Sequence, residues 1–297
     1  MVAGSVVFTK SEISDSPTQA AIHRFLRALG IEGLREVAQA NAERRMENSH
    51  TSASIRQALR SKNYAALERE AKRTLERNPY NRDGLQLLAL AYLCSKQTER
   101  LDECLQDVER NLPPTQAAEI IRFCADESGF DSLGLGIKDI ETAERYYRRA
   151  CKLDPNNAVT KNNFGYMLAE HGTKLDEAEV LIRAALQDEP NNTVFVDSLG
   201  WVYYKRGEYN RAARELGRAV NLAKNNNLRS SGTADLHYHL GMALWKMNRV
   251  GEARQAFRNA IDLAPQHNDA REALKELEKT SHRNVTQQLE QGWWLPT

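Results

Sequence analysis

The segment DSLGWVYYKRGEYNRAARELGRAV, residues 197–220, alternates glycine and alanine with large aromatic and aliphatic residues at fixed offsets. The later segment GMALWKMNRVGEARQAFRNAIDLAP, residues 241–265, superposes on it at the small and the large positions. A third copy precedes both, with one additional residue between its two halves. The shared positions are Gly165, Leu168, Ala178, Ile182 and Ala185; Gly200, Tyr203, Ala212, Leu216 and Ala219; and Gly241, Leu244, Ala253, Phe257 and Ala260. Such a repetition indicates a protein built from stacked units.

Shorter versions of the pattern continue upstream, where only the second half of each copy is clear. They comprise Tyr64, Leu67, Ala71, Thr74 and Pro79; Leu101, Leu105, Val108 and Pro113; and Ala143, Tyr147, Ala150 and Pro155. These copies lack the glycine of the first half. The period is about 34 residues, and from Asn48 to His267 the chain resembles the tetratricopeptide repeat family. The Gly200-Trp201 pattern with Tyr203-Tyr204 looks most like the bacterial members.

The resemblance implies an all-α fold, a right-handed superhelical solenoid of about six helix pairs with extra N-terminal helices and a C-terminal capping helix. Each pair consists of two antiparallel helices joined by a short turn. Small residues such as Gly200 and Ala212 let the helix axes approach closely. Tyr203 and Leu216 then fill the spaces between the helices, and Gly207 suits the turn because it has no Cβ.

The repeats divide the chain into three predicted parts. Residues 1–47 form a lead and capping helices, residues 48–267 form the solenoid, and residues 268–297 form a capping helix and a tail. The predicted units are 48–81, 82–115, 116–157, 158–192, 193–233 and 234–267.

Some segments depart from the repeat. Residues 125–141 are expected to be an insertion in the turn of the third unit, and residues 224–234 a long connection between the fifth and sixth. Residues 268–279 predict a polar capping helix with Ala273 and Leu274 on its inner side, and residues 281–297 a loosely ordered tail.

Composition excludes several classes of protein. The 41 basic and 40 acidic residues give no charge excess of the kind that nucleic-acid or membrane-surface proteins show. The four cysteines form no CxxC pair, so a zinc site is not expected and free thiols in a reducing compartment are. The N-terminus has no positive charge before its short apolar run, which argues against a secretory signal peptide. A cytoplasmic protein is therefore expected, or a periplasmic one if a signal peptide was trimmed.

In the solenoid that the resemblance implies, the first helices line a concave groove. Amide, aromatic and thioether side chains at outward positions of these helices suit a bound peptide, because amides hold peptide backbone and aromatics supply large anchors. The predicted groove residues are Asn162, Asn163, Tyr166, Asp197, Ser198, Trp201, Tyr204, Tyr238, His239, Met242 and Trp245. The alternative is that Trp201 and Trp245 pack between adjacent first helices.

Some family members bind acidic C-termini through lysine, asparagine and arginine of the first helices. Here Asp235 and His239 stand where those members need cations, which argues against that mode in the last three units. His237 and His239 are two residues apart on a helix, so they do not share a face and predict no metal site. No catalytic set of residues is recognisable, and neither an enzyme nor a cofactor is predicted.

Arginines recur at outer positions of several second helices, namely Arg69, Arg73, Arg145, Arg149, Arg214 and Arg218. They could form a basic stripe for an acidic partner or nucleic acid. Acidic residues interrupt the stripe, and a solvated helix face is the simpler interpretation. Two adjacent tryptophans near the end of the chain, Trp293 and Trp294, are costly to expose, so they are expected either to dock or to pack on the capping helix.

The resemblance implies a non-catalytic scaffold or adaptor that binds a peptide or partner domain in the groove and helps to assemble a larger complex. Three alternatives stay open at this stage. One is a dedicated chaperone for a secretion, pilus or polysaccharide-assembly client. Another is a nucleic-acid-linked regulator that uses the outer arginines. The third is a sensory arm cut from a larger enzyme.

Overall fold

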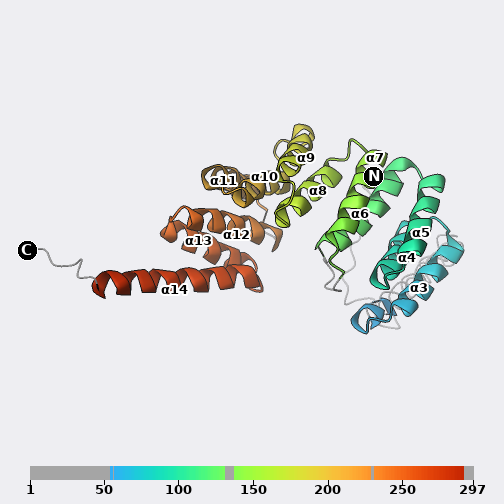
Figure 1. Ribbon diagram of the computed structural model, residues 1–297, viewed down its shortest axis with the longest axis horizontal. Coiled ribbons are helices and arrows are strands. Elements are labelled where there is room, and N and C mark those ends of the chain that lie inside the picture. Colours follow the sequence, from blue (N-terminus) through green and yellow to red (C-terminus); the bar gives the residue numbers. More distant parts are fainter. Residues whose placement is uncertain (1–53, 56, 131–136, 229–230, 291–297) are drawn as a thin grey trace, which may run out of the picture.

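The computed structural model describes residues 54–290 apart from 56, 131–136 and 229–230 (Figure 1). Helices follow one another along the described chain, with short turns between them. Their bounds are α3 Tyr64–Arg77, α4 Arg82–Cys94, α5 Thr98–Asn111, α6 Pro114–Phe130, α7 Ile140–Leu153, α8 Ala158–Glu170, α9 Leu175–Asp188, α10 Thr193–Lys205, α11 Tyr209–Asn225, α12 Ser231–Lys246, α13 Val250–Leu263 and α14 Asn268–Glu290. The prediction of an all-α solenoid is confirmed.

Close helix approach explains the glycine positions. A Cβ on Gly165 would lie 2.8 Å from the carbonyl oxygen of Ala178 and 2.7 Å from Cγ1 of Ile182. A Cβ on Gly200 would lie 2.6 Å from Cγ of Leu216. Because real Cβ contacts are longer than this, α8 can pack on α9, and α10 on α11, only with glycine at these places.

The turns and helix starts follow from local chemistry. Gly207 has φ +80 in the turn between α10 and α11, a conformation that costs glycine nothing. Asn157 and Asn192 accept hydrogen bonds from backbone N–H groups in the first turns of α8 and α10. These side chains satisfy donors that the helix cannot pair by itself, so each first helix begins at a fixed residue.

The structure places a helix where the sequence predicted an insertion. Helix α6 continues through Ala125 to Phe130, and Ala125 and Ser128 are fully buried. Gly129 faces α7, because a Cβ there would lie 3.4 Å from that of Ala143 and 2.9 Å from Cγ of Met167. The third pair therefore has a first-helix glycine after all, and the predicted insertion is wrong for residues 125–130.

Two other boundaries also differ from the sequence prediction. Helix α11 runs to Asn225 and α12 begins at Ser231, so the connection is shorter than residues 224–234. Helix α14 continues to Glu290, and the prediction of a loose tail is wrong for residues 281–290. Ala273 is buried and Leu274 packs on the same cluster, as predicted for the capping helix. Residues 1–47, Trp293 and Trp294 lie outside the described residues.

The first helices form the inner surface of the solenoid. Helices α4, α6, α8, α10, α12 and α14 each contact the next in this series. Among the described helices, the backbones of the second helices α5, α7, α9, α11 and α13 do not approach one another in this way, and only side-chain pairs such as Arg145 with Asp102 bridge them. The stack therefore curves towards its first helices (Figure 1). From this curvature we infer that the free faces of the first helices line its concave side.

Candidate functional site

Residues four apart place one stripe of side chains on the inner side of each first helix, because such residues share a helix face. Helix α8 contributes Asn162, Tyr166 and Glu170, and α10 contributes Asp197, Trp201 and Lys205. The corresponding stripe of α12 is Tyr238, Met242 and Lys246. These stripes, with their immediate neighbours on the same helices, are called the inner face below.

Part of the inner face is packed rather than exposed. The prediction of outward-facing side chains is wrong for five residues, which are at most 6% exposed: Asn162, Asp197, Ser198, Trp201 and His239. The physical reason is the close contact between neighbouring first helices, whose seam these side chains fill. Trp201 donates its Nε1–H to Glu170 at 2.7 Å and stacks on His239 with ring centroids 4.2 Å apart. For Trp201 the alternative, packing between first helices, is confirmed.

The remaining predicted groove residues are partly exposed, namely Asn163, Tyr166, Tyr204, Tyr238, Met242 and Trp245. The aromatic rings among them form a continuous array above the buried side chains of the seam. Tyr204 stacks on Trp201 at 4.6 Å, and Tyr166 lies 5.8 Å from Phe130 of α6. Tyr238 lies 5.6 Å from the buried His239. The structure thus brings side chains of α6, α8, α10 and α12 together into one aromatic surface.

A buried ion pair joins α10 to α12 beneath this surface. Nδ1 of His239 lies 2.8 Å from Oδ2 of Asp197, and both side chains are only 8% exposed. Burial by itself lowers the pKa of His239, but the charge and hydrogen bond of Asp197 outweigh it, so the pKa is raised. The pair is therefore charged at the lower end of the neutral pH range and ties the two helices together.

A second polar cluster lies at the α6 end and was not predicted from the sequence. Asp126 accepts hydrogen bonds from Tyr147 and Asn163 and pairs with Arg122. Burial raises the pKa of Asp126, although Arg122 and the two hydrogen bonds oppose the rise. The signal was available, because Asp126 stands three residues before Gly129, as Asp197 stands before Gly200.

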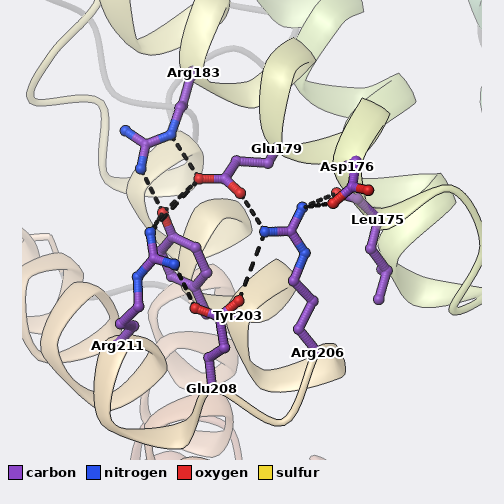
Figure 2. A network of polar contacts seen from close by, with 8 residues as sticks. All are labelled: Leu175, Asp176, Glu179, Arg183, Tyr203, Arg206, Glu208 and Arg211. Atoms are coloured by element: carbon purple, nitrogen blue, oxygen red, sulfur yellow. Dashed lines mark hydrogen bonds and ion pairs between the residues drawn. The ribbon is translucent and has the colours of Figure 1, made fainter.

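A charged network joins α9, α10 and α11 at the turn after α10 (Figure 2). Glu179 accepts hydrogen bonds from Arg183 at 2.8 Å, from Tyr203 at 2.8 Å and from Arg206. Burial opposes ionisation, but these donors lower the pKa of Glu179 to about 2. Arg211 lies over the Tyr203 ring, 4.0 Å from its centroid. These arginines hold the fourth and fifth helix pairs together.

Several outer arginines are also occupied within the chain. Arg145 pairs with Asp102 at 2.9 Å, and Arg149 pairs with Glu109 and Asp102. Arg218 pairs with Glu215 at 3.3 Å. These pairs neutralise much of the predicted stripe, which favours the interpretation of a solvated helix face.

Chemistry other than binding has little support in the described part of the chain. Those residues contain no group of three or more His, Cys, Asp or Glu placed to hold a metal ion. Burial raises the pKa of the Cys124 thiol and that of Cys104, the latter to about 11, which makes both poor nucleophiles. Within the same residues no helix combines the length and apolar character that a membrane crossing requires.

Two family models match the chain. Both are described as tetratricopeptide repeat, and they cover residues 234–267 and 133–157. This is a tetratricopeptide repeat protein. The first match spans helices α12 and α13, the last helix pair before α14. Its repeats mark it as a protein–protein interaction scaffold in general, in a family that is generally non-enzymatic.

The same fold occurs among solved structures, of which 260 chains match this tetratricopeptide repeat protein. One is the crystal structure of BtubC (BKLC) from P. vanneervenii, with a TM-score of 0.52 and 17% sequence identity. The match covers 72% of this chain and 92% of the other. At this identity the likeness concerns the fold alone. None of the curated proteins compared with the chain matches it.

Proposed function

We propose that the protein is an adaptor that holds a segment of a partner protein against the inner face and so assembles a larger complex. The observation that carries the proposal is the aromatic array across consecutive first helices. Tyr204, Tyr238 and Trp245 keep part of their surface open while their inner edges rest on buried rings. Rigid, half-buried aromatic side chains are the usual anchors of protein interfaces.

The buried side chains beneath the array support this proposal. Trp201, His239 and Asp197 hold one another in place by stacking and hydrogen bonding, so the exposed rings above them have little freedom to lose on binding. A surface that is ordered in advance loses less entropy when a partner docks.

Site-specific photo-crosslinking tests the proposal. A photo-reactive amino acid replaces either Trp245, on the inner face, or Val180, whose side chain is 68% exposed on the second helix α9. Both variants are expressed in cells of the source organism and irradiated. The proposal expects discrete crosslinked proteins from position 245 and few from position 180. Equal crosslinking at the two positions, or products from position 180 alone, would contradict it.

A further inference from the structure

Carboxylates gather around the aromatic array at the C-terminal end of the inner face. The side chain of Glu170 on α8 is 39% exposed, that of Asp235 on α12 is 60% exposed, and Asp269 on α14 is exposed. Tyr238 lies among them. Burial and then the negative charges of Asp269, Glu170 and Asp235 raise the pKa of Tyr238 to about 12. Three helices thus direct acidic groups to the surroundings of one half-buried ring.

The cations in this region do not balance these charges. Lys205 donates to the backbone oxygen of Glu170 at 2.8 Å and lies 3.9 Å from its Oε2. His267 lies 3.1 Å from Asp235, while its Nδ1 accepts a hydrogen bond from the backbone N–H of Ala270. Among the described residues Asp269 has no ion-pair partner, and Lys246, at the far end of α12, pairs with none of these carboxylates.

Buried oxygen atoms without a donor give a second, independent observation. Asp197 is 6% exposed and Asn162 is 2% exposed, and Oδ1 of each has no hydrogen-bond partner. They hold the same position in α10 and α8, four residues before Trp201 and Tyr166. A buried acceptor that lacks a donor costs free energy. Each atom is covered by its neighbours, so a donor from outside the chain would reach it only through a bridging water admitted to the seam.

The protein already shows how this surface holds a cation. The ammonium of Lys205 lies 5.1 Å from the centroid of the Trp201 ring, beside the Glu170 carboxylate and carbonyl. An aromatic face and an adjacent carboxylate together replace part of the hydration of the ammonium group. Tyr238 offers a comparable setting, with part of its ring still open. Its centroid lies 5.2 Å from that of His267, which pairs with Asp235, and the charge of Asp269 contributes to its raised pKa.

We propose that the C-terminal end of the inner face, on α8, α10 and α12, together with the start of α14, binds a partner segment that carries lysine or arginine side chains. The inference rests on the proposed function and names the chemistry of the partner. A cationic side chain lies over Tyr238 and pairs with Asp235 and Asp269, while its neighbours in the segment pack on the aromatic array. An acidic segment would meet like charge here. Because the whole chain has a formal net charge of only +1, selection between partners must come from this local arrangement.

Fluorescence anisotropy with defined peptides tests the inference. The probe is a short labelled peptide of lysine, leucine and serine, and its companions carry glutamine or glutamate at every lysine position. The full chain is compared with the double variant Asp235→Asn, Asp269→Asn. The matched control is Glu103→Gln, Asp107→Asn, which removes two exposed charges from the second helix α5. Circular dichroism checks that both variants fold.

We expect the lysine peptide to bind more tightly than both companion peptides. The double variant Asp235→Asn, Asp269→Asn should lower the affinity for the lysine peptide roughly tenfold, whereas the control variant should lower it less than about twofold. If Asp269→Asn loosens α14, Glu170→Gln replaces it, because glutamine still accepts the Trp201 hydrogen bond; it too should weaken the lysine peptide. The inference is overturned if the Asp235→Asn, Asp269→Asn variant and the control variant change the affinity equally. It is also overturned if the glutamate peptide binds more tightly than the lysine peptide, or if the lysine peptide does not bind. If the glutamine peptide binds as tightly as the lysine peptide and crosslinks at position 245, the inference of a basic partner segment is wrong, while the proposed adaptor function stands.

Discussion

The glycine at the centre of helix α8 offers the sharpest test of how the helix pairs are held. Alanine is the better helix former, by about 1 kcal/mol over glycine, so Gly165→Ala would stabilise an isolated helix. In the structure the added Cβ would lie 2.8 Å from the Ala178 carbonyl oxygen and 2.7 Å from Cγ1 of Ile182. The carbonyl belongs to the backbone of α9 and Ile182 is fully buried, so neither can move cheaply.

Overpacking of this kind costs about 1–3 kcal/mol, and contact with backbone belongs at the upper end of that range. After the gain in helix propensity, we expect Gly165→Ala to lower the free energy of unfolding by about 2 kcal/mol. The matched control is Gly217→Ala in helix α11, where a Cβ meets nothing within 4 Å. That variant should be stabilised by about 0.5–1 kcal/mol.

Thermal and urea unfolding, followed by circular dichroism at equal protein concentrations, would measure the difference. A loss of 2 kcal/mol lowers the melting temperature by roughly 4–8 °C in a protein of this size. Midpoints are the quantity to compare, because repeat arrays do not always unfold in a single step. The reasoning is refuted if Gly165→Ala melts at or above the wild-type temperature while Gly217→Ala is raised, since the two helices would then separate without cost.

Three further predictions concern titratable groups. The lowered pKa of Glu179 gives stability that is complete above pH 4.5 and is lost as pH falls towards about 2. The loss is about 1–2 kcal/mol after solvent screening. In urea titrations, the unfolding free energy of Glu179→Gln should therefore fall less steeply between pH 4.5 and pH 2 than that of the wild type. The raised pKa of His239 gives stability that is complete below pH 6.5 and is lost as pH rises through the raised pKa. Asp197→Asn should remove this pH dependence. If the variant keeps the wild-type profile of melting temperature against pH, the ion pair between His239 and Asp197 does not stabilise the fold. Burial and a raised pKa should make Cys124 the last thiol that iodoacetamide modifies in the native protein, which peptide mass spectrometry would show; early modification would contradict its burial.

Repetition made much of the fold predictable. Glycine, alanine and large apolar residues recur at matching offsets in the last three units, so a local pattern in one unit could be checked against the others. The first-helix glycine of the third unit was missed because two more residues separate Gly129 from Ala143 than separate Gly200 from Ala212. Allowing a longer turn in the alignment would have placed Gly129 correctly and extended α6 to its observed end.

The candidate site was predictable only as a set of positions. Helical spacing places Tyr166, Trp201 and Met242 on equivalent faces, and the sequence indicated this. It did not indicate which of them are covered, because exposure depends on the distance between neighbouring first helices. Trp201 is buried while Tyr166 and Met242 are partly open, although all three hold the same place in their units.

The sequence by itself determined the helix pairs, their order and the positions at which helices must touch. These follow from short-range rules of spacing, side-chain size and turn chemistry, which act within a single unit. Only the tertiary structure decided which polar groups meet. Asp197 and His239 are 42 residues apart in the chain, and Glu170 and Trp201 are 31 apart, yet both pairs are in hydrogen-bond contact. The curvature of the stack sets these contacts, and curvature is a sum of small packing angles between units that no local pattern records.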